Sequence, residues 1–346
     1  MEEKKLDINS IIGFVLIFGI LLWMLYNNRP TPEELEAQEK AKQEQVELEE
    51  KEAAAKDEFV TTPEDFIAED TPDSLKLADL QTKIGAFAYS ESLSNGAEFT
   101  ELENDVLAIK VSNKGGYIAE VKLKQYVNHD SVPIYLIKDN NTFFNINFGT
   151  TDNRTLNTNQ LYFQPSLTNS GDNQVLSMKL KVSESKYLEY RYELKPNDYM
   201  LGFVIRSQGL GTTINSSQEV KLDWKLKGRR HAKSITYENR YTRLTYQHDG
   251  NRISKLSQAS DDEETEVDVD WLSFRQHFFS SILTSDTPFK SVSLSSIDLV
   301  KDEEIDTLFT KSYAASIPLE LKGGELNESL GLYYGPTDSA ILKDYD

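Results

Sequence analysis

The chain has 346 residues, 38% of them hydrophobic, enough to bury one large core or two ordinary ones. Its formal net charge of -20 argues against a nucleic-acid partner, because binding to phosphates needs clustered Lys and Arg. The absence of cysteine excludes disulfides, Cys metal ligands and Cys nucleophiles. It does not exclude an oxidising compartment, since a domain with a large core is stable without disulfides.

An uncharged apolar run lies between Ile11 and Tyr26. With Ile8 to Ser10 it is 19 residues long, and a helix of that length measures about 28 Å, close to the hydrocarbon thickness of a bilayer. Lys4 and Lys5 precede it, which favours an N-terminus in the cytoplasm and a remainder outside it. We therefore predict a transmembrane signal anchor at residues 1–28. Its membrane-contacting side chains would be Ile11, Phe14, Leu16, Phe18, Leu21, Trp23 and Tyr26.

Two alternatives remain for this run. A cleaved signal peptide would share the positive start, but the run is long for one and no small-residue cleavage site follows it. It also ends in Trp23 and Tyr26, which suit a membrane interface. A buried core helix is the poorer alternative, because the run has no polar face and both flanks are charged.

Residues 29–83 are predicted to be an acidic linker. Between Glu33 and Glu58 there are 11 acidic and 4 basic residues. The residue types favour a helix, but Leu35, Val46 and Leu48 do not keep a heptad, which argues against a coiled coil. A solvated helix and a disordered tether both fit this composition.

After the linker the pattern changes to the two-residue period of β-strands. Apolar and polar side chains alternate at 117–124, 175–182, 187–194 and 219–226, separated by turns such as Gly115-Gly116. In the first of these segments, Tyr117, Ala119, Val121 and Leu123 are expected to share one face. No strand–helix alternation intervenes, so we predict one all-β domain at residues 84–334, a large antiparallel β-sandwich.

No catalytic or cofactor motif is present. His129, His231, His248 and His277 lack metal-ligand spacing, and there is no nucleophile elbow, phosphate loop or dinucleotide fingerprint. The acidic run 261–270 could attract a divalent cation, but it lacks the central glycine of an EF-hand loop. A solvated loop leading into a strand is the simpler interpretation. The sequence therefore predicts no enzyme activity, no cofactor and no metal site.

One positive cluster lies in the stretch WKLKGRRHAK. Its Lys227, Arg229 and Arg230 could contact lipid head groups or an acidic partner. The alternative is that these residues only offset the neighbouring acidic side chains.

Three stretches together resemble one known family: SNKGGYIAEVKLKQY at 112–126, VDWLSFRQHFFSSIL at 269–283 and LYYGPTDSAILKDYD at 332–346. They are similar to the periplasmic region of the YidC membrane-protein insertases of Gram-negative bacteria. The matching positions, for which a mostly structural role is expected, are Gly115, Gly116, Trp271, Gln276, His277, Phe279, Gly335 and Pro336. By strand alternation, Trp271, Ser273, Arg275 and His277 would share one face.

The resemblance implies a β-supersandwich with a few short helices near its end, and a connection to the insertase core at residues 335–346. Family members continue into a membrane-lying helix and five transmembrane helices. After Tyr26 no segment here is long and apolar enough to cross a bilayer, so we expect this sequence to stop before that core. The implied location is the bacterial inner membrane, and the implied partners are membrane lipid, the Sec translocon and nascent membrane proteins.

The predicted function is therefore that of the N-terminal part of an insertase and chaperone, which integrates inner-membrane proteins alone or with the Sec translocon. This region would act as an anchor and a periplasmic interaction module. Two alternatives stay open. The abundant Tyr and three Trp could serve a carbohydrate-binding sandwich as stacking platforms. A single-pass adaptor of an envelope assembly is the other, although the heptads that would support it are absent.

Overall fold

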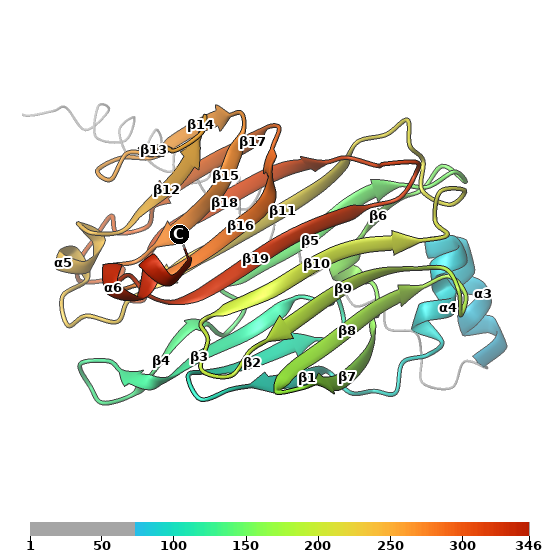
Figure 1. Ribbon diagram of the computed structural model, residues 1–346, viewed down its shortest axis with the longest axis horizontal. Coiled ribbons are helices and arrows are strands. Elements are labelled where there is room, and N and C mark those ends of the chain that lie inside the picture. The colour runs from blue at the N-terminus through green and yellow to red at the C-terminus, as the bar shows by residue number, and fades with distance from the viewer. Residues whose placement is uncertain (1–72, 346) are drawn as a thin grey trace, which may run out of the picture. The chain divides into compact units, whose positions relative to one another are not determined.

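Strands with one buried face build three antiparallel sheets (Figure 1). The structure is a computed structural model that describes residues 73–345. The predicted signal anchor at 1–28, with all the side chains named for it, and the acidic residues up to 72 lie outside this described part. Within residues 73–345, no helix is both long and apolar enough to cross a membrane.

Helices are few. Helix α3 (Asp73–Ile84) occupies the last part of the predicted linker and leads through η1 (Gly85–Phe87) into α4 (Ala88–Glu91). The ring of Phe87 is buried 5.5 Å from that of Phe148, so the core begins before the first strand. The other helices are η2 (Thr158–Gln160), α5 (Ile235–Asn239), α6 (Ser339–Leu342) and η3 (Lys343–Tyr345).

The largest sheet has nine strands. In spatial order they are β13 (Arg252–Lys255), β12 (Arg243–His248), β15 (Val269–Arg275), β16 (Phe279–Phe289), β19 (Asn327–Pro336), β10 (Met200–Gln208), β9 (Tyr187–Leu194), β8 (Asn173–Lys181) and β7 (Gln164–Ser170). The last strand of the chain, β19, lies in the middle, between β16 and β10.

A six-stranded sheet packs against the nine-stranded one. Its strands are β14 (Asp262–Glu266), β17 (Val292–Asp298), β18 (Phe309–Leu319), β11 (Val220–Arg229), β5 (Thr142–Gly149) and β6 (Thr155–Asn157). The remaining sheet has four strands, which are β1 (Phe99–Glu103), β2 (Leu107–Ser112), β3 (Ile118–Val127) and β4 (Pro133–Ile137). Asn141 connects the four-stranded and six-stranded sheets. Its Nδ2 donates to the carbonyls of Leu136 in β4 (3.0 Å) and Lys227 in β11 (2.9 Å).

Aromatic side chains fill the space between the nine-stranded and six-stranded sheets. Trp224 of β11 stacks on Phe274 of β15 with ring centroids 4.2 Å apart, and Phe274 stacks on Tyr313 of β18 at 5.2 Å. Phe144 of β5 packs edge-to-face on Tyr190 of β9, with ring centroids 5.9 Å apart. Such pairs add about 1 kcal/mol each to the free energy of burying their area.

The fold class predicted from the sequence is confirmed: an all-β, antiparallel sandwich with short helices near its end. One face assignment was wrong. In β3 the buried residues are Ile118, Val121 and Leu123, whereas Ala119 is only half-buried. The register against β2 shifts between Lys110 and Val111, and this β-bulge changes which side chains face inward.

Gly116 lies in the tightly packed turn before β3, and replacing it measures how much this packing contributes to stability. Its φ is +68°, and an added Cβ would lie 2.9 Å from ring atoms of the buried Phe163. We expect Gly116→Ala to lower the free energy of unfolding by about 2–4 kcal/mol, because backbone strain and overpacking add. Urea unfolding of the detergent-solubilised chain, followed by tryptophan fluorescence, measures this loss.

Gly96→Ala is the matched control. Gly96 also has a positive φ, +76°, but no atom lies within 4 Å of its added Cβ. It should cost only about 1 kcal/mol, from the backbone alone. Equal losses in the two variants would contradict the packing argument.

Candidate functional site

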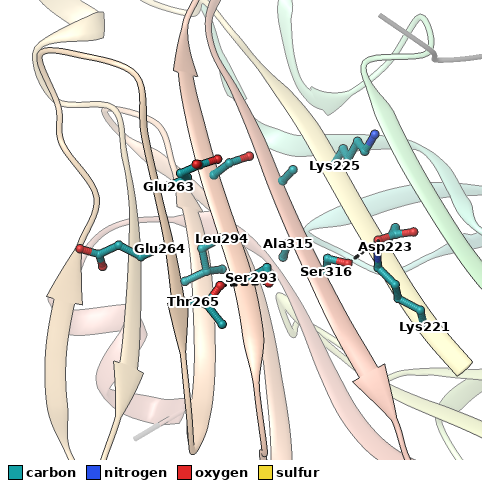
Figure 2. Close-up of a pocket in the computed structure, with 12 residues that line it drawn as sticks. Lys221, Asp223, Lys225, Glu263, Glu264, Thr265, Ser293, Leu294, Ala315 and Ser316 are labelled. Carbon is teal, nitrogen blue, oxygen red and sulfur yellow. Dashed lines mark hydrogen bonds and ion pairs between the residues drawn. The ribbon is translucent and has the colours of Figure 1, made fainter. Parts of the chain in front are cut away.

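A groove of about 670 Å³ crosses the outer face of the six-stranded sheet (Figure 2). Small side chains of β17 and β18 form its floor: Ser293, Ser295, Ala314 and Ser316. Longer side chains stand on both sides of this floor: Lys221, Asp223 and Lys225 on β11, and Glu263 and Thr265 on β14. The hollow exists because the short Ser and Ala side chains lie between longer ones.

Strand register sets the polar groups of the groove in rows. Ser293 pairs with Thr265 on one side and Ser316 on the other, and Ser316 pairs with Asp223. The Ser316 hydroxyl donates to Asp223 Oδ1 at 2.6 Å, and the hydroxyls of Thr265 and Ser293 lie 3.2 Å apart. In the next row Ser295 pairs with Glu263. The floor therefore offers hydroxyl donors and acceptors along a line across four strands.

Opposite charges flank the floor. Lys221 Nζ lies 3.7 Å from Asp223 Oδ1, and Lys225 Nζ lies 5.3 Å from the ring centroid of Phe143. Glu263 stands on the β14 side, whereas Figure 2 shows Glu264 turned away from the floor. The groove lining contains hydroxyls, carboxylates and lysines but no histidine, and such groups can hold a polar ligand.

Of the predicted basic stretch 224–233, Lys225 lines this groove, but Lys227, Arg229 and Arg230 do not. Arg229 pairs with Asp139 at 3.2 Å and lies over the ring of Phe309, 5.6 Å from its centroid. Arg230 donates to the carbonyl of Lys233 at 3.1 Å. Lys227 follows Lys225 on the same face of β11 but does not line the groove. A contact of these three residues with lipid or an acidic partner stays a prediction.

Residues 262–266 of the acidic run 261–270 form the edge strand β14, and the last two residues of the run begin β15, so the interpretation of this run as a loop leading into a strand was wrong. Its carboxylates are divided between the two faces. Glu264 accepts a hydrogen bond from the Tyr246 hydroxyl, and Glu266 Oε2 lies 2.7 Å from His248 Nδ1. Charged side chains on an edge strand also discourage pairing with another chain.

The predicted motif around Trp271 divides between a strand and a turn. Trp271, Ser273 and Arg275 share the outer face of β15, but the strand ends at Arg275. His277 and Phe278 therefore lie in the turn to β16, and the prediction that His277 continues the strand face was wrong. Gln276 is buried at this turn, and Phe279 is buried 5.4 Å from the ring of Tyr126.

Gly335 and Pro336 end the central strand β19. An added Cβ at Gly335 would lie 2.6 Å from Tyr333 Oη, and that hydroxyl donates to the Pro336 carbonyl at 2.7 Å. Pro336 pairs with Phe279 of β16. Gly335 and Pro336 therefore pack at the end of the domain. Gly115 likewise has a positive φ, +91°, in the turn before β3.

His231 belongs to a buried polar cluster beside α5. Its Nε2 lies 3.0 Å from the Tyr135 carbonyl, so this nitrogen carries the proton and donates. Glu238 Oε2 accepts hydrogen bonds from the backbone N–H groups of His231 and Ala232, both at 2.7 Å. Burial lowers the pKa of His231 to about 4 and raises the pKa of Glu238. A neutral imidazole is therefore part of the folded state at neutral pH.

Sequence reasoning did not find the groove floor. A signal was present: the stretch Ser291 to Ser295 alternates Ser with Val and Leu, which predicts a strand with one hydroxyl-rich face. That face lies beside Ser316 and Asp223 only because β17, β18 and β11 are neighbours in the sheet. Residues this far apart in sequence give no hint of that order.

Residues 100–346 match the family model described as the YidC periplasmic domain. The chain belongs to the YidC family. The membrane protein insertase YidC of Parabacteroides distasonis is 32% identical over 345 residues, covering 99% of this chain and 53% of that protein. The same figures for identity and coverage hold for the membrane protein insertase YidC of Porphyromonas gingivalis W83, over 349 residues. The chain spans about half the length of these relatives.

Solved structures show weaker likeness. The periplasmic domain of the Thermotoga maritima YidC has a TM-score of 0.38 and 9% identity, covering 72% of this chain and 89% of that one. A galactose mutarotase-like protein from Lactobacillus casei has a TM-score of 0.41 and 11% identity, covering 69% of this chain and 99% of that one.

The buried His231 predicts how stability changes with pH. Its folded-state pKa of about 4 lies below the ordinary 6.5, so between these values the unfolded chain binds more protons than the folded one. Stability should therefore fall as the pH drops from 7 to 4, and His231 accounts for up to about 3 kcal/mol of this loss. His231→Gln should make the loss smaller in urea unfolding followed across this pH range.

Glu238→Gln is the matched variant, and its expected effect on the acid-induced loss of stability has the opposite sign. Because the pKa of Glu238 is raised, the folded state binds its proton more readily, and this carboxyl stabilises the fold as the pH falls. Glutamine keeps an oxygen acceptor for the two backbone donors but removes the titration, so the acid loss should become steeper. Profiles that shift in the same direction in both variants would contradict these assignments.

Proposed function

We propose that this chain is the N-terminal part of a membrane-protein insertase, and that its β-domain is a periplasmic interaction module. The match to the YidC periplasmic domain over residues 100–346 carries the first part of this proposal. The parent protein would integrate inner-membrane proteins alone or with the Sec translocon, without covalent catalysis. Residues 1–28 would anchor it, with the N-terminus in the cytoplasm and the domain in the periplasm.

The polar groove supports the second part. Its floor presents the hydroxyls of Ser293 and Ser295 along β17, and that of Ser316 beside Ser293 on β18, which suits the N–H and C=O groups of an extended polypeptide. Lysines on one side and Glu263 on the other favour a segment that carries both charges. We propose that a Sec translocon subunit or a nascent membrane protein places such a segment in the groove.

The groove gives little support to the carbohydrate-binding alternative. Trp224 is buried against Phe274, so this side chain is not a stacking platform for a sugar. The groove floor presents Ser and Ala rather than aromatic rings.

Site-specific photocrosslinking tests the proposed module. A photoreactive phenylalanine analogue at Ser295, on the groove floor, should form adducts with Sec translocon subunits or an arrested nascent membrane protein in inner-membrane vesicles. Lys221→Glu together with Lys225→Glu should reduce the adduct yield about fivefold, a loss of about 1 kcal/mol. The same analogue at the exposed Leu167 of β7, in the nine-stranded sheet, is the positional control. Equal labelling at both positions, or none at Ser295, would contradict the groove as the binding site.

A further inference from the structure

Two arginines face each other on the outer side of the nine-stranded sheet without a neutralising partner. Arg243 of β12 and Arg275 of β15 are directly paired in the register. The Nε atom of each is buried and has no hydrogen-bond partner, and neither guanidinium forms an ion pair with a carboxylate of residues 73–345. Like charges directly opposite in a sheet repel each other. In a chain of net charge -20, such a pair needs an explanation.

A third unsatisfied donor lies beside them. Ser280 of β16 pairs with Arg275 in the register, and its hydroxyl is buried without a hydrogen-bond partner. Only 2% of Ser280 is exposed. Arg243, Arg275 and Ser280 therefore form a row of donors across three adjacent strands. We call these three residues the donor row. An anion in contact with it would satisfy the serine hydroxyl and remove the repulsion between the arginines.

An apolar cavity of about 190 Å³ adjoins the donor row. Arg275 and Ser280 line it, and its apolar lining consists of Met200, Trp271, Ile282, Tyr333, Leu342 and Tyr345. The last two belong to α6 and η3, which lie against this face of the sheet (Figure 1). A ligand that contacts the donor row and also fills the cavity would carry a negative charge and an apolar group of a few carbon atoms.

Exposed aromatic rings border the same region. His277, next to Phe278 in the turn after Arg275, stacks on Tyr241 with ring centroids 4.4 Å apart. Tyr241 is 38% exposed and Phe278 is 55% exposed. The backbone N–H of Thr337, which lines the cavity, donates to the Phe278 carbonyl at 2.8 Å, so ring cluster and cavity share a border. Exposed Tyr beside basic residues is typical of surfaces that contact the head groups of a bilayer.

We propose that the donor row binds the phosphate of an anionic phospholipid headgroup, and that the adjoining cavity receives the first carbons of its acyl chain. Arginine suits this role because its planar fork of N–H donors matches phosphate oxygens. The apolar cavity next to the charge favours a lipid over free phosphate. The site lies on the opposite outer face from the groove, and the proposal does not depend on the proposed function.

Hydrogen–deuterium exchange on the full chain in lipid nanodiscs tests the site. Nanodiscs that contain phosphatidylglycerol should slow exchange about tenfold in peptides covering 276–278 and 337–345, relative to pure phosphatidylcholine nanodiscs. Arg243→Gln with Arg275→Gln should abolish this protection. Arg252→Gln removes one charge from the same sheet, at an exposed residue paired with Asp249, and should leave the protection intact.

Three results would overturn the proposal. Equal protection in pure phosphatidylcholine would mean that no anionic headgroup is recognised. Equal protection by inorganic phosphate added to phosphatidylcholine nanodiscs would mean a site for free phosphate. Protection that survives the double Arg variant would mean binding elsewhere. The double variant should stay folded, with an unchanged or higher melting temperature without anionic lipid, because it removes a repulsive pair. A marked drop in that temperature would also count against the proposal, since the arginines would then be structural.

Discussion

Aromatic stacking between the two larger sheets is the contact on which the rest of the structure depends. Trp224, Phe274 and Tyr313 form one continuous stack through three strands of two different sheets. The Tyr313 hydroxyl also donates to the Arg275 carbonyl at 2.9 Å, so the polar end of this ring is satisfied while its face is buried. Because the inner faces are committed to this core, binding is left to the outer faces of the sheets.

Each outer face uses a different chemistry. On the six-stranded sheet, small hydroxyl-bearing side chains leave a polar trough with charges on both sides. On the nine-stranded sheet, α6 and η3 cover part of the face, and the cavity beneath them is largely apolar, with Arg275 at its wall. The linings of the two surfaces share no residue, so the two proposed ligands would not compete for a side chain.

Much of the fold followed from the sequence because alternation is local. The segments 187–194 and 219–226 placed Tyr190, Tyr192, Trp224 and their neighbours inward, as the structure has them. The β-bulge in β3 defeated the same reasoning, since one extra residue changes the phase of the pattern. The groove and the donor row could not be predicted from the sequence, for a different reason. Ser293 and Asp223, or Arg243 and Arg275, meet through the order of strands, which alternation does not determine.

The central position of β19 has a mechanical meaning. Tension applied to the chain after Pro336 acts on a strand whose hydrogen bonds run to β16 on one side and β10 on the other. Those hydrogen bonds are perpendicular to the strand. A force along β19 must therefore shear the hydrogen bonds to both neighbours at once, whereas an edge strand could be peeled off one hydrogen bond at a time. The C-terminal end of the domain can therefore carry load without unravelling the sheet.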